Sequence, residues 1–425
     1  MRKIETPSRD LYHYLPQLPI SERDRRWNKA RGWMREHGVD ALLVVANDMT
    51  FGLGLGNMRY LSACAPRHGG YLIFPLEGEP VIIAEQYHMY RPYHPCLMAH
   101  DWVKIAYPNV TVDDMLNILE EHVSPLKKLG LVSGANTVQY QNMPYDVFHR
   151  IHERLNNVEI IDASKMIFDM RAIKSEPELE FLRKAGKIHR KMLQAMIDTA
   201  EAGVRENEVF AAMMSTMLRE GAESQGFNLL HSGPVDGPYI EHMLHGLDAD
   251  MCPTSRPLQK GDAIISESHA SYGGYMSAAE FTVCIGEPPK EYRRLYEAGV
   301  ECLLASLPYL TPGHTFGDAI DAEMEVVNKY GLDMLELGFH GHGIGSPEPP
   351  KAIRMGLDQT PIPPRWKLDR STLDVEFQEG MVVGTNIDLF DPNWRFDSGI
   401  MFGDCVIIGK KPELLVGTPQ ELVVK

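Results

Sequence analysis

The sequence contains no long apolar run and no excess of basic residues. No segment approaches the roughly 18–20 consecutive apolar residues that a membrane-spanning helix requires, so we expect no membrane partner. The 42 Lys and Arg residues are outnumbered by 58 Asp and Glu residues, which gives a formal net charge of −16. Because a nucleic-acid-binding surface needs clustered Lys and Arg, we also expect no nucleic-acid partner.

Paired cysteines and a secretory leader are also lacking. The N-terminal residues MRKIETPSRDLYHYLPQ are too polar for the hydrophobic region of a signal peptide. No two cysteines form a CxxC pair, and several lie in apolar runs such as TVCIGEP and GDCVII, where buried thiols are common. We therefore expect a cytoplasmic protein with reduced cysteines that serve in packing. The six cysteines are Cys64, Cys96, Cys252, Cys284, Cys302 and Cys405.

A chain of 425 residues exceeds what one hydrophobic core usually organises, so two domains are expected. The amphipathic pattern of residues 21–38 predicts a helix that ends at Gly38. Strands are predicted at DALLVVAN, YLIFPL, PVIIAE, KLGLVS and VEIIDAS, and helices at residues 112–126 and 145–156. This alternation indicates a smaller α/β domain over residues 1–165.

Residues 166–425 present a different order of elements. One helix is predicted to begin after Ser175, a candidate N-cap with Pro177 in the first turn. The remaining helices are predicted at 205–220, 290–307 and 316–330, and the strands at GDAIISESHA, GYMSAAEFTVCIG, GMVVGTNIDLF and GDCVIIG. This order indicates an antiparallel sheet with helices on one side, an α+β architecture. Residues 346–374 hold six prolines and no clear period, so they are predicted to form a long loop.

Eight phrases occur in the order that is typical of one known family. They are NMRYLS, PLEGEPVIIAE, RAIKSEPELEFLRKA, QKGDAIISE, YGGYMSA, FHGHGIG, EGMVV and SGIMFGDCVII. Each phrase alone is weak, but together, across almost the whole chain, they resemble the creatinase/aminopeptidase P family. The resemblance implies a C-terminal pita-bread domain, residues 166–425, preceded by a smaller α/β creatinase-type domain, residues 1–165. It also implies a homodimer.

Metal-dependent members of this family hold two divalent ions with two Asp, one His and two Glu residues, and most of these are changed here. Ala and Gly supply no donor atom and Asn supplies only a neutral carbonyl, whereas a two-metal site needs several carboxylates. We therefore expect no metal and no cofactor. The matching positions are Glu267 and Ala278 for the two Asp, His342 for the His, and Asn386 and Gly403 for the two Glu.

Other acids and imidazoles stand close to these altered positions. Side chains two apart on a strand lie on the same face of a sheet, so a displaced polar cluster that includes His342 is predicted. Such a cluster would bind a substrate or a single metal ion; the alternative is a set of solvated strand ends. The neighbours are His269 beside Glu267, Glu280 beside Ala278, and Asp388 beside Asn386.

The segment GGYMSAAEFT resembles that of creatinase, a metal-free member in which a Glu at the position of Glu280 contacts a cationic guanidinium. Ectoine hydrolase is a second metal-free member that handles a delocalised C–N cation. A carboxylate suits such a planar cation, and an imidazole can carry a proton to the departing nitrogen. We predict Glu280, His342 and Glu267 as catalytic residues. The predicted substrate-binding residues are His242, His245, His269, Glu348, Asn386 and Asp388.

The leading interpretation is a metal-independent hydrolase acting on a non-peptide C–N bond of a small cationic or zwitterionic substrate. Three alternatives stay open: a lyase acting on a small organic solute, a non-catalytic pita-bread protein that binds a small molecule or peptide, and an Xaa-Pro peptidase. A pure binding protein would tolerate the loss of every acid, so the survival of Glu267, Glu280 and His342 favours an enzyme.

Overall fold

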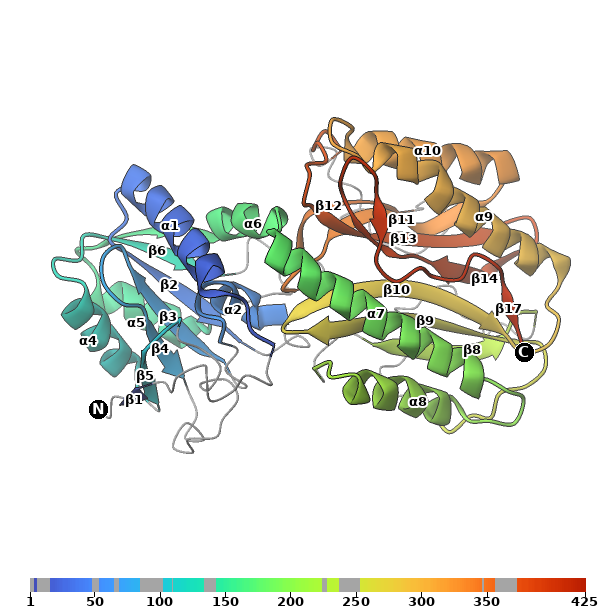
Figure 1. Cartoon of the computed structure of the whole chain (residues 1–425), viewed down its shortest axis with the longest axis horizontal. Helices are drawn as coiled ribbons and strands as arrows, with labels where there is room; N and C mark the ends of the chain where they lie inside the picture. The colour runs from blue at the N-terminus through green and yellow to red at the C-terminus, as the bar shows by residue number, and fades with distance from the viewer. Residues whose placement is uncertain are drawn as a thin grey trace. The chain divides into compact units, whose positions relative to one another are not determined.

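The structure is a computed structural model of the whole chain (Figure 1). It describes residues 4–5, 16–47, 53–64, 69–84, 102–108, 110–133, 143–223, 228–236, 253–345, 348–355 and 373–425. The chain divides into two compact units, Met1–Arg171 and Ala172–Lys425. The predicted boundary between residues 165 and 166 falls inside helix α6 (Ser164–Ala172). None of the helices in these ranges is both long and apolar enough to cross a membrane.

The first unit is built on a mixed sheet of seven strands in the order β1-β5-β4-β3-β2-β6-β7. The strands are β1 (Ile4–Glu5), β2 (Ala41–Ala46), β3 (Gly70–Pro75), β4 (Val81–Ala84), β5 (Ile105–Pro108), β6 (Lys128–Val132) and β7 (Glu159–Asp162). The helices besides α6 are α1 (Ile20–His37), α2 (Gly56–Ser62), α4 (Val112–His122) and α5 (Tyr145–Arg154), and η2 (Leu53–Leu55) is a single 3₁₀ turn. These elements confirm the predicted α/β organisation.

Local sequence explains the main elements of this unit. Helix α1 ends where Gly38 adopts a left-handed φ of 64°, a conformation that glycine adopts without steric cost. Strand β2, with the sequence ALLVVA, is buried along its whole length. It pairs antiparallel with β3 and parallel with β6, and its Leu43 and Val45 pack in one core with Leu116 and Leu119 of α4.

The second unit contains two sheets rather than the single antiparallel sheet predicted. One has the order β17-β10-β9-β8, and the other follows β12-β11-β13-β15-β16 with β14 paired to β13. An isolated bridge between Glu280 and Gly403 joins them. The strands are β8 (Leu229–Pro234), β9 (Asp262–Tyr272), β10 (Tyr275–Cys284), β11 (Asp333–Gly341), β12 (Glu348–Met355), β13 (Val382–Asp391), β14 (Arg395–Phe402), β15 (Cys405–Ile407), β16 (Glu413–Leu414) and β17 (Val423–Val424).

The prediction of a loop over residues 346–374 was wrong for its first part. Residues 348–355 form β12, which pairs antiparallel with β11, and the register shifts between His340 and Gly341. The two prolines at this shift, Pro349 and Pro350, lack an N–H group, and such an irregularity tolerates them. Residues 356–372, which include Arg365 and Trp366, lie outside the described part of the chain.

The helices of the second unit confirm the sequence prediction closely, and they cover one face of the sheets. They are α7 (Glu176–Thr199), α8 (Glu206–Arg219), α9 (Lys290–Ser306), the 3₁₀ turn η6 (Leu307–Tyr309) and α10 (Phe316–Tyr330). Ser175 is the N-cap of α7, and its N–H donates to Glu178 Oε2 at 2.9 Å. Helix α7 lies along β9 and β10, whereas α9 and α10 pack on the other sheet (Figure 1).

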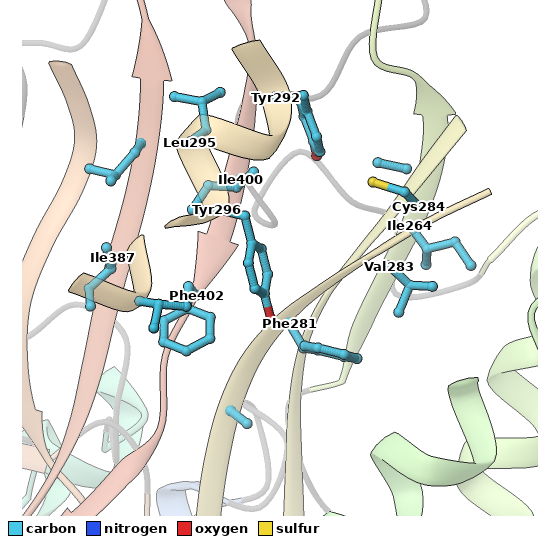
Figure 2. Close-up of a cluster of buried hydrophobic side chains, with 14 of the residues drawn as sticks. Ile264, Phe281, Val283, Cys284, Tyr292, Leu295, Tyr296, Ile387, Ile400 and Phe402 are labelled. Atoms are coloured by element: carbon cyan, nitrogen blue, oxygen red, sulfur yellow. The ribbon is translucent and has the colours of Figure 1, made fainter. Parts of the chain in front are cut away.

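A large apolar core fills the space between the helices and the two sheets (Figure 2). Ile264, Phe281 and Ile387 reach it from β9, β10 and β13, and Tyr296 of α9 meets Phe402 edge to face at 5.4 Å. Side chains alternate between the two faces of a strand, so the neighbours of these apolar residues lie on the face away from the helices. We call this the inner face, and it carries Glu267, His269, Glu280, Asn386 and Asp388.

Four of the six cysteines lie within the described residues. Cys64, Cys284, Cys302 and Cys405 are free and buried, as predicted. Cys96 and Cys252 lie outside the described residues.

Candidate functional site

The two predicted catalytic glutamates lie side by side on the inner face. Strands β9 and β10 pair antiparallel with Glu280 directly opposite Glu267 and Ala278 opposite His269. Residues opposite each other in such a pair lie on one face, with their Cβ atoms about 4.5–5.5 Å apart. Glu280 is buried, whereas Glu267 is partly exposed. The pairing therefore brings Glu267, His269 and Glu280 together.

Glu280 also bonds to the second sheet. Asn386 Nδ2 donates to Glu280 Oε1 at 2.7 Å, and the backbone N–H of Ile387 donates to Oε2 at 3.3 Å. The amide nitrogen of Asn386 therefore faces the Glu280 carboxylate, and its Oδ1 points away from it. Within the described residues, this buried Oδ1 has no hydrogen-bond partner. Asn386 thus ties Glu280 to the second sheet.

The residues present do not fit a two-metal centre. A Cβ added at Gly403 would clash with the carbonyl oxygen of Thr385 and would lie 3.1 Å from Glu280 Oε2. Glu280 therefore borders the space that a carboxylate at position 403 would need. Ala278, opposite His269, supplies no donor. No group of three or more His, Cys, Asp or Glu side chains arranged to hold a metal ion is found in the described ranges.

Three histidines form a cluster beside the glutamates. The buried ring of His342 stacks on His269 with centroids 5.8 Å apart and lies 4.6 Å from the ring of His340. Gly384 makes room for this arrangement, because a Cβ there would clash with the His342 ring. Burial lowers the pKa of His342 well below its ordinary value, and the charges of His340, His269 and Lys174 lower it further. A hydrogen bond with the Met276 backbone acts in the opposite direction but is outweighed. The imidazole is therefore neutral near pH 7.

Glu348, predicted as a substrate-binding residue, lies in a buried ion pair. Its Oε1 accepts a hydrogen bond from Lys174 Nζ at 2.9 Å, and each side chain is only 2% exposed. The pair packs against Gly343, the residue after His342. The structure thus places Glu348 in the wall of the histidine cluster, paired with Lys174.

Asp388 extends the polar inner face along β13. It lies two residues beyond Asn386, is fully buried and stands directly opposite Glu336 of β11. Glu336 was not among the predicted site residues, although the alternation of ELGFHG places it on the same face as His340. The inner face therefore holds two pairs of facing acids, Glu267 with Glu280 and Glu336 with Asp388.

A fourth histidine, His189 of α7, supports the site from the helix side. Its Nε2 lies 2.9 Å from Ser268 Oγ and its Nδ1 lies 3.3 Å from Ser277 Oγ. Burial and the charge of His269 lower its pKa to about 3. His189 was not predicted, and its place on the buried stripe of α7 with Ile188 and Met192 was the available signal.

The upstream histidines are described only in part. His231 of β8 lies opposite Ile265 of β9, and Leu229 of the same strand lies opposite Glu267, so His231 belongs to the inner face. The predicted substrate-binding residues His242 and His245 lie outside the described residues. Their role stays a prediction.

Two sheets with helices on one face and a polar inner face define the pita-bread class of proteins. Residues 180–410 match the model of metallopeptidase family M24, and residues 26–173 match the creatinase/prolidase N-terminal domain. Because the first match covers more than half of the chain, the protein belongs to metallopeptidase family M24. The resemblance to the creatinase/aminopeptidase P family and the predicted fold are thereby confirmed.

Similar proteins include Xaa-Pro dipeptidases and an ectoine hydrolase. The Xaa-Pro dipeptidase of Pyrococcus horikoshii is 25% identical over 395 residues, 92% of this chain and 96% of that protein. The ectoine hydrolase of Halomonas elongata is 25% identical over 426 residues, 96% of this chain and 99% of that protein. The crystal structure of the P. horikoshii OT3 prolidase matches at a TM-score of 0.71 and 22% identity, over 94% of this chain and 100% of that chain. The protein is thus a member of a family of hydrolases.

Proposed function

We propose that this protein is a metal-independent hydrolase of a non-peptide C–N bond in a small cationic or zwitterionic substrate. The observation that carries the proposal is the buried pair of Glu280 and Asn386, which bond to each other where metal-dependent relatives need carboxylate ligands. A buried carboxylate is stable when a cation or several hydrogen bonds compensate it. A planar organic cation supplies both the positive charge and the hydrogen bonds.

The proposed substrate class depends on a carbon atom that is electrophilic without a metal ion. The central carbon of an amidinium or guanidinium group already carries positive character, so water can attack it without a metal ion. In the reaction, a bond forms between the water oxygen and that carbon, and the bond from the carbon to the departing nitrogen breaks. The water oxygen loses both of its protons as it becomes the carbonyl oxygen, and the departing nitrogen gains two, so the cation and the water become a neutral amide or urea and a protonated amine.

The side chains divide these tasks according to their chemistry. Glu280, assisted by Glu267 opposite it, binds the cation and positions its carbon. His342, which is neutral because burial and nearby cationic groups lower its pKa, carries the two protons in turn from the water to the departing nitrogen. His269, stacked on His342 at 5.8 Å, fixes the plane of that ring.

The experiment combines metal analysis with an activity screen. Purified protein, before and after chelation, is incubated with guanidino acids, amidines and cyclic amidines, and amine release is followed. Turnover that survives chelation, and that falls by at least about 100-fold in E280Q and H342N, supports the proposal. The matched control E325Q changes an exposed glutamate of α10 and should keep full activity. Turnover that requires a stoichiometric metal ion would refute it.

Cleavage of Xaa-Pro dipeptides is the second candidate, and one observation favours it. The P. horikoshii relative that matches over 92% of this chain is named an Xaa-Pro dipeptidase. Against it stand Ala278, Asn386 and Gly403, which supply no carboxylate. Incubation with an Xaa-Pro dipeptide in the presence of added Mn²⁺ or Co²⁺ separates the two: proline release that depends on the metal would favour the peptidase.

A further inference from the structure

We propose that the buried ion pair of Lys174 and Glu348 positions the ring of His342, the histidine that carries protons in the proposed reaction. This inference rests on the proposed function for the task of His342. It deepens that function by naming two residues that act on the site through another side chain. Glu348 then serves the site as a positioning residue and does not touch the substrate.

The ion pair is enclosed by protein on all sides. Lys174 Nζ lies 2.9 Å from Glu348 Oε1, and each side chain is only 2% exposed. Lys174 Nζ also donates to the backbone oxygen of Ala172 at 3.2 Å. Exposed ion pairs contribute little, because their long side chains keep much of their freedom. A buried, hydrogen-bonded pair instead holds its surroundings in one arrangement.

The pair contacts the backbone on both sides of His342. A Cβ added at Gly341 would lie 2.6 Å from the backbone oxygen of Glu348. A Cβ added at Gly343 would clash with Glu348 Oε1 and would lie 2.9 Å from Lys174 Cε. Glycine lacks a Cβ and so permits these two close approaches. The backbone around His342 is therefore enclosed by Glu348 on one side and by the ion pair on the other.

Both members of the pair are anchored beside the strands that carry His342. The N–H of Lys174 donates to the oxygen of Gly380, just before β13, at 2.9 Å. Glu348 begins β12, which pairs with β11, the strand that leads into His342. The N–H of His342 donates in turn to the oxygen of Val382, the first residue of β13, at 2.8 Å. The Lys174–Glu348 bond thus ties together the two ends of this support.

The position of the His342 ring decides whether it can carry protons. Proton transfer requires the ring nitrogen within hydrogen-bond reach of the reacting atoms. The ring has a hydrogen bond with the Met276 backbone and stacks on His269 at 5.8 Å, and both contacts depend on where its backbone lies. A misplacement of about 1 Å can lower a rate about 100-fold. Lys174 and Glu348 therefore affect the reaction through His342.

The test follows the ring N–H signal of His342 by nuclear magnetic resonance, which needs no substrate. Full-length protein with isotope-labelled histidine is measured near neutral pH, and the signal that is missing from H342N is assigned to His342. We expect one sharp signal in the wild-type protein. In K174M/E348M, this signal should shift or broaden. Replacement of a buried ion pair by apolar side chains of similar volume is often neutral for stability, so the variant should fold.

Activity gives a second measurement and a matched control. On a compound that the wild-type protein hydrolyses, K174M/E348M should lower kcat by about 100-fold and leave KM unchanged, because neither residue touches the substrate. The control K191M/E220M makes the same exchange at an ion pair whose side chains are 57% and 32% exposed. It should keep both the wild-type His342 signal and the wild-type kcat.

Three outcomes would overturn the inference. They are a wild-type protein without a resolved His342 signal, a folded K174M/E348M with an unchanged signal, and an active K174M/E348M with an unchanged kcat. If circular dichroism shows that K174M/E348M is unfolded, K174R decides. It keeps a charged hydrogen-bond donor towards Glu348 and should preserve the His342 signal, so loss of the signal in folded K174R also overturns the inference.

The outcome is separable from that of the proposed function. A protein whose His342 signal depends on the ion pair, but which hydrolyses none of the screened compounds, retains the positioning of His342 and loses the hydrolase assignment. A chelation-resistant hydrolase whose K174M/E348M variant keeps the wild-type signal and kcat retains the proposed function and loses this inference.

Discussion

Replacement of Asp404 by Asn should strongly destabilise the second unit. Asp404 is 1% exposed and directly follows Gly403, which bridges to Glu280. Its Oδ1 accepts from the N–H groups of Cys405 at 2.7 Å and Val416 at 3.0 Å. Its Oδ2 accepts from the N–H groups of Gly417 at 2.7 Å and Thr418 at 2.8 Å, and from the Thr418 hydroxyl at 3.1 Å.

The magnitude follows from the number of acceptors lost. Asparagine replaces one carboxylate oxygen with an NH₂ group, and the less harmful orientation puts that group at the Oδ1 position. Two hydrogen bonds are then lost. Because a hydrogen bond to a charged group contributes about 1.5–3 kcal/mol, D404N should lower the free energy of unfolding by about 3–6 kcal/mol. For a unit of this size, each kcal/mol shifts the melting temperature by about 2–4 °C, so a decrease of roughly 6–24 °C is expected.

The assay is urea and thermal unfolding of D404N beside D321N, which makes the same exchange at an exposed position of α10. D321N should lie within about 0.5 kcal/mol of wild type, as surface substitutions usually do. A D404N protein that loses less than about 1 kcal/mol would show that the Asp404 carboxylate does not hold the Val416–Thr418 segment, and the reasoning would fail.

Three further predictions concern buried acids and the altered metal positions. Burial raises the pKa of Glu323 well above its ordinary value, so its contribution to stability is present below about pH 4.5 and is lost as pH rises. E323Q should therefore raise the melting temperature at pH 8 more than at pH 4, and calorimetry showing no pH-dependent difference would contradict this. Burial raises the pKa of Glu22, but hydrogen bonds and charges from Arg25 and Arg26 outweigh it and lower that pKa to about 2. The stability that these ion pairs contribute above pH 4.5 is therefore lost as pH falls towards 2. E22Q should destabilise the first unit at pH 7 and flatten this acid dependence in circular dichroism, and an unchanged profile would argue against the ion pairs. G403E should lower the free energy of unfolding by more than about 2 kcal/mol, because its side chain has no room beside Thr385. Elemental analysis of G403E should detect no bound metal. A stable variant with stoichiometric metal would show that the site still accepts a metal ion.

The helices and the inward-facing residues were accessible from sequence because they depend on local periodicity. The start of α7 at Ser175 and the end of α1 at Gly38 follow from capping preferences within a few residues. The period of two places His269 beside Glu267 and Glu280 beside Ala278 on their strands. The lack of carboxylates at Ala278, Asn386 and Gly403 is likewise visible in the sequence, because the family's phrases show which positions match the metal ligands of relatives.

Pairings between distant strands were not accessible in the same way. Residues 348–355 were predicted as part of a loop, because their prolines outweigh any periodicity, yet the edge of β11 supplies the backbone partners that make them a strand. The division into two sheets likewise depends on which strands meet, and strand order is not encoded in the pattern of any single strand.

The sequence by itself indicated an α/β domain followed by a pita-bread domain, and it determined that three positions matching metal ligands of relatives carry no carboxylate. Only the tertiary structure decided what replaced the ligands. Asn386 bonds to Glu280 across 106 residues of sequence, and Lys174 pairs with Glu348 across 174. Such contacts form because folding of the whole unit buries polar groups that must then find partners, and no local pattern specifies which partners those will be.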